Sequence, residues 1–371
     1  MSTEPREEHS LPKRKSLLTR DQLRTIFSPD LTTSLIAILL ALLVGALLIA
    51  SMGVNPLVAY RTLLDGALGN KNSIAETLIR AIPLALVGVG VSIGFRAGTF
   101  NIGGEGQLFL GAAAATWVGL QFASLPGYVL IPLMILASML AGGIWAAIAG
   151  ILKIRFNASE LINTIMMNYI AIFFVNFLVH GPMKEPNSPL GQSSHLPDQA
   201  LLGILMRPTR LHSGIIITIA VVAIAYVLLW HTSWGYQIRA CGKNPLAALA
   251  AGINVNWIAL SAFALSGAFA GIAGFCEAAG VQHRLLENIS PGYGYTAIVV
   301  ALLGQTNPTG VLAAAILFAG LQVGASTMES AIGVPSSIVT IVQYLIVIFI
   351  IGRGALGLLR RRISPAKERS E

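Results

Sequence analysis

Charged residues are scarce in this sequence. Asp, Glu, Lys and Arg make up only 11% of its 371 residues, and hydrophobic residues make up 55%. A soluble globular chain carries about 25% charged residues, so this chain has too few charges to cover a water-facing surface of ordinary size. The mean hydropathy is +0.74, and apolar runs of about 20 residues, enough to cross a bilayer, recur along the chain. These features indicate an all-α, polytopic integral membrane protein.

Cysteines, metal-ligand clusters and nucleotide-binding motifs are scarce or absent as well. Two cysteines, Cys241 and Cys276, are too few for a disulfide framework. No group of His, Cys, Asp and Glu has the spacing of a metal site. The phosphate-binding loop G-x-x-x-x-G-K-[ST] is missing, because the one Gly-Lys pair, Gly242-Lys243, is followed by Asn. We therefore expect no catalytic residue, no metal and no cofactor in this chain.

The apolar segments predict about ten membrane spans. The first run is too long, and follows too long a polar region, for a cleaved signal peptide. The run at 293–305 is short for a complete crossing. The expected spans are 32–52, 77–97, 102–121, 128–151, 160–179, 213–230, 257–279, 293–305, 310–327 and 335–352, which gives a tail 1–31, a transmembrane domain 32–352 and a basic tail 353–371.

The distribution of Lys and Arg predicts the orientation of these spans. The formal charge of +8 comes mainly from the two tails and from short loops. Cytoplasmic segments of membrane proteins carry an excess of Lys and Arg. Most basic residues fall on one side when both termini are cytoplasmic, with Lys153, Arg155, Arg239 and Lys243 on that side. The basic balance therefore indicates membrane orientation and no nucleic-acid partner.

Two loops are long enough to have functions of their own. The outer loop 181–212 contains five prolines, which suit a semi-rigid external surface, although an ordinary irregular loop would look the same. The cytoplasmic loop 231–256 contains Asn244-Pro245, a favoured helix start, and Gly252, a favoured helix end. The short Ala/Leu helix between them either inserts into a groove on another protein or lies against the membrane or its own bundle.

A polar, glycine-rich stretch interrupts the apolar pattern at 94–115. Its glycines include Gly103 and Gly104, and its polar residues include Asn101, Glu105 and Gln107. Irregular backbone at membrane depth is tolerated inside protein or beside water, and broken helices build substrate sites in many transporters. One interpretation is a helix break beside the translocation path. The other is a tight cytoplasmic hairpin in which Glu105 pairs with Arg96.

Further polar residues lie within the expected spans. Asn168 and Tyr169 belong to span 160–179, Ser266 belongs to span 257–279, and Gln305 ends span 293–305. We expect these residues on the translocation path or gate, with interhelical hydrogen bonds as the alternative role.

Two motifs resemble permease subunits of ATP-binding-cassette importers. They are FRAGTFNIGGEGQLFLGA at 95–112 and IRACGKNPLAALAAGINVNWIALSAFALSGAFAGIAG at 238–274. The similarity is to the branched-chain amino acid and simple-sugar permease superfamily, in particular its nucleoside-uptake branch, and covers about 75–355. It implies that the cytoplasmic helix couples the permease to an ATPase. The residues assigned to coupling are Arg239, Gly242, Asn244, Pro245, Ala247, Ala248, Gly252 and Ile253.

The resemblance also implies partners and a mechanism. The partners would be an ABC ATPase that binds ATP and Mg, a second permease subunit that is homologous or identical, an extracytoplasmic solute-binding protein, and membrane lipid. The cellular location would be the cytoplasmic or inner membrane of a bacterium or archaeon. The substrate implied is a nucleoside carried by alternating access, with a monosaccharide as the alternative. An ion-coupled secondary transporter and a membrane scaffold remain rival classes.

Overall fold

The computed structural model describes residues 29–349, with side chains from Ile36 onward. These residues form helices joined by loops, and two isolated β-bridges are the only strand-like pairings within that range. The helices are α2 (Pro29–Ser51), α3 (Pro56–Leu68), α4 (Lys71–Arg96), α5 (Gly104–Gln121), α6 (Gly127–Phe156), α7 (Glu160–His180), α8 (Gly214–His231), α9 (Ser233–Lys243), α10 (Pro245–Ala250), α11 (Val255–Glu277), α12 (Tyr293–Leu303) and α13 (Pro308–Ile332). The π-turn Ala278–Gln282 extends α11, and the last described helix is Ser337–Phe349.

The all-helical membrane class is confirmed, but ten complete crossings are not. Six helices within 29–349 are long and apolar enough to cross a bilayer, or seven if α2 and α3, which are bent by 117°, count as one broken span. Three expected spans fall short: α5, α12 and Ser337–Phe349. The 11 residues of α12 rise only about 16 Å, half of a hydrocarbon core. The tails 1–28 and 353–371, and with them the expected position of both termini, lie outside the described residues.

The sequence analysis assigned no span to α3. This helix begins at Asn55-Pro56, where the Asn55 side chain accepts a hydrogen bond from the Leu57 amide. Asn-Pro is the same start signal that was recognised at Asn244-Pro245, so the helix could have been found from its cap. Because α3 contains the charged residues Arg61 and Asp65, it does not stand out as an apolar run.

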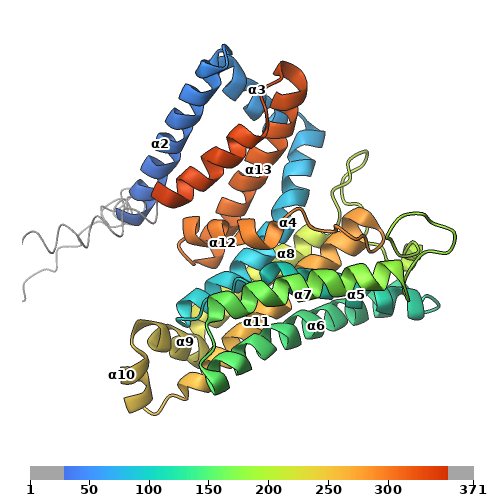
Figure 1. Ribbon diagram of the computed structural model, residues 1–371, viewed down its shortest axis with the longest axis vertical. Helices are drawn as coiled ribbons and strands as arrows, with labels where there is room; N and C mark the ends of the chain where they lie inside the picture. Colours follow the sequence, from blue (N-terminus) through green and yellow to red (C-terminus); the bar gives the residue numbers. More distant parts are fainter. Residues whose placement is uncertain (1–28, 350–371) are drawn as a thin grey trace, which may run out of the picture.

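The helices pack as two groups that share α4. Figure 1 shows α5, α6, α7 and α11 side by side, with α2, α3 and α13 in a second group. α11 packs against α4, α5 and α6, while α13 packs against α3 and α4. Glycines allow the closest approaches: a Cβ on Gly111 of α5 or on Gly142 of α6 would collide with the backbone of Gly271 or Gly267 on α11. Small residues let backbones approach in this way in membrane bundles.

The outer loop 181–212 is anchored to the chain that follows α11. The Ser193 amide donates to the Leu285 carbonyl at 2.9 Å, and the Leu202 amide donates to the Ala279 carbonyl at 3.1 Å. His212, at the end of the loop, is 1% exposed, and its Nδ1 accepts a hydrogen bond from the Gly214 amide at 3.2 Å. The Nε2 atom is buried without a hydrogen-bond partner. The loop is therefore packed in place, and His212 is held as a neutral ring.

Burial, with a contribution from His283, lowers the pKa of His212 to about 4. Because this pKa lies below the unfolded value of about 6.5, the contribution of His212 to stability is present above pH 6.5 and is lost as the pH falls toward 4. We expect the melting temperature of the detergent-solubilised protein to fall over this interval. His212→Gln, which does not titrate there, should flatten the fall. An unchanged pH profile in this variant would contradict the assignment.

Candidate functional site

The glycine-rich motif forms a break between α4 and α5 at membrane depth. Asn101, in this break, donates to the Ser266 hydroxyl at 2.9 Å. Ser266 lies eleven residues after the start of α11 at Val255, about 16 Å along the helix. The Gly106 amide meets Asn168, eight residues into α7 or about 12 Å from its start. The break therefore begins at the end of the bundle that carries Arg96, where the Phe100 amide donates to the Glu160 carboxylate at the start of α7, and it enters the bundle at Asn101.

The polar side chains of the break are bound to one another. Asn101 and Gln107 form a reciprocal amide pair, with 3.0 Å in each direction. The Asn101 carbonyl oxygen also accepts from the Gly103 amide at 2.9 Å, which closes the turn. Asn101 and Gln107 are each 1% exposed, and Ser266 is 2% exposed. These groups therefore satisfy the hydrogen bonds that irregular backbone needs inside a membrane.

Asn168 joins α7 to the same break. Its Oδ1 accepts from the Gly106 amide at 2.9 Å, and its Nδ2 donates to the Ile102 carbonyl at 3.0 Å. The side chain is fully buried, and Gly106 is pressed so closely against α7 that a Cβ would meet the Asn168 Cα atom at 2.8 Å. One asparagine thus supplies both hydrogen bonds at the point where α5 begins.

Glu105 does not pair with Arg96, as one interpretation of the sequence proposed. Its carboxylate accepts a hydrogen bond from the Gly294 amide at 2.6 Å, at the N-terminus of α12. A helix N-terminus carries unpaired amides and partial positive charge, which favour a carboxylate there. A Cβ on Gly294 would meet Glu105 Oε2 at 2.8 Å, so a glycine makes this contact possible. Glu105 therefore holds α12 against α5.

Two other candidate residues lie outside this network. Tyr169 is half exposed on α7. Gln305 lies in the turn between α12 and α13, where its carbonyl accepts from Arg96 at 3.3 Å. The network therefore brings together Asn101, Gly103, Gly104, Glu105, Gln107, Asn168 and Ser266, and it leaves Tyr169 and Gln305 apart.

The cytoplasmic motif folds into two short helices, α9 and α10. Asn244 separates them, and its side chain caps α10 by accepting from the Ala247 amide at 3.1 Å, next to Pro245 at the first helical position. α10 ends at Ala250, and two residues later Gly252 has a φ of +80°, which suits glycine. Ala248 is 4% exposed, and its carbonyl accepts from the Ile253 amide at 3.0 Å. These motif residues build the helix pair.

The exposed face of α10 belongs to residues that the sequence analysis did not single out. Leu246 is 79% exposed and Leu249 is 61% exposed, three residues apart on one face. Together with Pro245, Gly252 and Ile253 they border a shallow hollow. Exposed leucines on so short a helix are the kind of surface that inserts into a groove on a partner.

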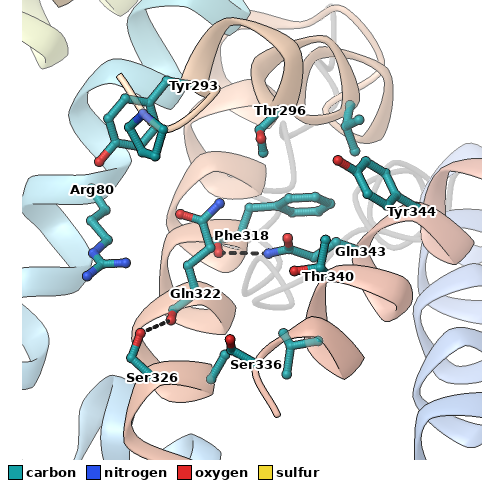
Figure 2. A pocket seen from close by; sticks show the side chains of 14 residues that line it. Arg80, Tyr293, Thr296, Phe318, Gln322, Ser326, Ser336, Thr340, Gln343 and Tyr344 are labelled. Atoms are coloured by element: carbon teal, nitrogen blue, oxygen red, sulfur yellow. Dashed lines mark hydrogen bonds between the residues drawn. The ribbon is translucent and has the colours of Figure 1, made fainter. Parts of the chain in front are cut away.

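A polar cavity lies between α4, α12, α13 and the helix Ser337–Phe349. It encloses about 280 Å³, and Figure 2 shows its side chains converging from all four segments. Of the lining residues in the described part of the chain, only Arg80 is charged. Amides, hydroxyls and rings supply the other polar contacts. These residues are Tyr293, Thr296, Phe318, Gln322, Ser326, Ser336, Thr340, Gln343 and Tyr344.

The sequence analysis missed this cavity. It did not consider Thr340, Gln343 or Tyr344. Their signal was helical spacing, because Ser336, Thr340, Gln343 and Tyr344 recur on one face of an apolar segment. Thr340 and Tyr344 are exposed in this subunit, so the cavity is open on that side. None of the residues of the Asn101 network borders it.

Replacement of Asn168 by Ala should destabilise the bundle. The change leaves the Gly106 amide and the Ile102 carbonyl buried without partners, at a cost of about 1–3 kcal/mol for each group. The measurement is the free energy of unfolding in mixed micelles. Asn176→Ala on the same helix is the matched control, because the Asn176 Oδ1 atom is buried without a hydrogen-bond partner and little is lost with it. Equal effects of the two changes would contradict the role given to Asn168.

Comparison with known proteins identifies the family. The family model "Branched-chain amino acid transport system / permease component" matches residues 73–351. The chain is 38% identical to a guanosine ABC transporter permease of Bacillus subtilis, over 86% of this chain and 92% of that protein. It is 37% identical to a glucose ABC transporter permease of Haloferax volcanii, over 86% of each chain. It is 34% identical to a nucleoside ABC transporter permease of Lactococcus lactis, over 85% of this chain and 89% of that protein. No solved structure matches the chain. With three quarters of its length matched, the chain belongs to this family of ABC transporter permease subunits.

Proposed function

We propose that this chain is the membrane-spanning subunit of an importer that carries nucleosides through the cavity lined by Arg80, Gln322 and Gln343. The observation that carries the proposal is the chemistry of the cavity wall. Tyr293 and Tyr344 offer rings on which a nucleobase stacks, an interaction worth about 1–3 kcal/mol per base. Amides offer both donors and acceptors for base edges and ribose hydroxyls. The wall suits a neutral, aromatic and hydroxylated solute.

A monosaccharide is the second candidate substrate. The glucose permease of Haloferax volcanii is as similar to this chain as the guanosine permease of Bacillus subtilis. Sugar hydroxyls would use the same amides and could also stack on the tyrosines. The two substrates differ in what they require from the wall, because only a base has aromatic edges that need paired donors and acceptors. Uptake measured with both classes separates them.

Energy for transport would come from a separate ABC ATPase that binds ATP and Mg. The sequence has no phosphate-binding loop, and the exposed leucines of α10 provide a docking surface. A second permease subunit, identical or homologous, would close the open side of the cavity at Thr340 and Tyr344. An extracytoplasmic solute-binding protein would deliver the solute at the opposite face. Alternating access would then open the cavity first to one side of the membrane and then to the other.

The orientation follows from the helix ends that lie together. The C-termini of α4, α6 and α8 and the start of α11 share the face of α9 and α10, as Figure 1 shows, and Arg96, Lys153, Arg155, Arg239 and Lys243 belong to this face. An excess of basic residues is typical of cytoplasmic faces, which supports a cytoplasmic position for this one. We infer the cytoplasmic or inner membrane of a bacterium or archaeon as the location. The cytoplasmic position of both termini and the ten-span count remain parts of this proposal.

Substitution in the cavity should reduce uptake of the true substrate. Gln322→Leu keeps the side-chain volume but removes a donor and an acceptor, so we expect about a tenfold loss of transport efficiency, the effect of one or two hydrogen bonds. The measurement is uptake of radiolabelled nucleosides and monosaccharides by a transport-deficient cell that expresses the complete importer. Gln121→Leu, at the exposed outer end of α5, is the control. Sugar uptake without nucleoside uptake would overturn the substrate, and uptake that survives ATP depletion would favour a secondary transporter.

Charge on the exposed face of α10 should separate the permease from its ATPase. Leu246→Glu combined with Leu249→Glu changes two side chains that do not support the fold, so we expect normal membrane insertion, loss of ATPase co-purification and loss of uptake. Leu190→Glu, on the outer loop and 62% exposed, is the matched control and should keep both. Undiminished co-purification of the double variant would contradict docking at α10.

A further inference from the structure

Arg96 lies at a junction of four elements beside the cytoplasmic helices. It is the last residue of α4, and its Nε donates to the Thr306 carbonyl at 2.6 Å. Its Nη2 donates to the Gln305 carbonyl at 3.3 Å. Both carbonyls belong to the turn between α12 and α13. One guanidinium therefore holds the C-terminal end of α12.

The same guanidinium also stacks on Trp230, which in turn contacts Arg239 of α9. The Arg96 guanidinium carbon lies 4.7 Å from the centroid of the Trp230 ring, and the Arg239 guanidinium carbon lies 4.8 Å from it. Trp230 lies in the last turn of α8, and Arg239 belongs to α9. Stacking of a guanidinium on an indole is favourable, so the indole joins two cations that would otherwise repel each other.

The backbones at the C-terminal ends of α4 and α9 are also in direct contact. A Cβ on Gly242 would collide with the Arg96 carbonyl oxygen, and a Cβ on Gly98 would meet the Gly242 Cα atom at 3.3 Å. No room is left between the two helix ends. A displacement of α9 and α10 is therefore transmitted directly to the end of α4 and to Arg96.

The turn that Arg96 holds has an unusual conformation. Gln305 and Thr306 are consecutive non-glycine residues, and both have φ of 55°. Left-handed backbone is uncommon outside glycine and is a real outlier for a β-branched residue such as Thr306. Such conformations persist where surrounding contacts impose them. Here the Gln305 amide donates to the Leu302 carbonyl and the Thr306 amide donates to the Ala301 carbonyl, and the two hydrogen bonds from Arg96 add to these contacts.

α12 connects this turn to the cavity. It has only 11 residues and lies between Gly292, with φ of +93°, and Gly304. Glu105 holds its N-terminal end, and Arg96 holds its C-terminal end. Tyr293, Thr296 and Val299 face the cavity from α12. On α4, Arg80 at the cavity lies sixteen residues before Arg96, which corresponds to about 24 Å along the helix. α12 spans most of this distance.

We propose that Arg96 is a positioning residue of the transport cycle, which converts displacement of α9 and α10 into a tilt of α12 and so reshapes the solute cavity. This inference rests on the proposed function. The ATPase moves the cytoplasmic helices, Trp230 and Arg239 carry the movement to Arg96, and the two carbonyl contacts carry it to α12. Glu105 provides the fixed point at the other end.

The test uses the complete importer, with its ATPase and binding protein, reconstituted in lipid nanodiscs and proteoliposomes. Arg96→Gln removes the charge and the contacts. Arg96→Lys keeps the charge, but an ammonium cannot hold two carbonyls and stack as a guanidinium does. We expect both to keep ATPase assembly and ATP hydrolysis within about twofold of wild type. Solute moved per ATP should fall about tenfold or more, the factor that one lost charge-assisted hydrogen bond produces.

A spectroscopic distance reports the movement itself. Spin labels at Tyr295→Cys on α12 and Tyr236→Cys on α9 occupy exposed positions, while the native Cys241 and Cys276 are buried. The wild-type distance should change between the nucleotide-free and vanadate-trapped states, and the change should be absent in Arg96→Gln. This readout needs ATP and no solute, so it also stands if the nucleoside assignment fails.

Matched variants decide between positioning and general destabilisation. Trp230→Leu removes the stack and leaves both carbonyl contacts, so it should uncouple transport in the same way even if Arg96→Gln does not assemble. Arg61→Gln, on the exposed surface of α3 with a long and exposed pair to Asp65 at 3.9 Å, should match wild type. Hydrolysis and uptake that fall in proportion, or a distance change that persists in both junction variants, would overturn the proposal.

Discussion

Satisfaction of hydrogen bonds at the break between α4 and α5 is the constraint on which the rest of the fold depends. The backbone at 97–103 is not helical. It begins beside α9 and the first residue of α7, and at Asn101 and Ile102 it reaches the interior beside α11 and α7. No water or lipid can pair with it there at low cost. Asn101 and Asn168 bond to this backbone, and Gln107 and Ser266 hold the Asn101 side chain in place. Their positions therefore fix α5 against α7 and α11.

In α10, the residues that shape the helix differ from the residues that are exposed on its surface. Asn244, Pro245 and Gly252 shape α10, and Ala248 is buried beneath it. The exposed apolar side chains of α10 are Leu246 and Leu249, the surface that we propose for docking. A motif that defines a helix therefore need not be the motif that touches the partner, since capping and close packing place stricter demands on residue type than an apolar contact does.

α12 lies between the break that follows α4 and the Arg96 junction beside α9. It is too short to cross the membrane, and it is suspended between a carboxylate at its N-terminal end and a guanidinium at its C-terminal end. Long spans packed through glycine contacts, such as α11 with α5 and α6, resist displacement. A short helix held by charged contacts at both ends can change its tilt while those contacts persist, and three of its side chains line the cavity.

The sequence by itself determined the membrane class and most helices, including α10. Long apolar runs have few alternatives in a bilayer, and Asn-Pro and Gly signals act locally. It could not determine the partner of Glu105, because Gly294 is 189 residues away, nor which leucines of α10 face outward. It also could not choose between a surface hairpin and a buried break at 94–115. Only the tertiary structure decided these points, because contacts between residues far apart in the chain depend on how the helices pack. For the same reason the polar spacing at 336–344 did not by itself reveal the cavity, which four segments build together.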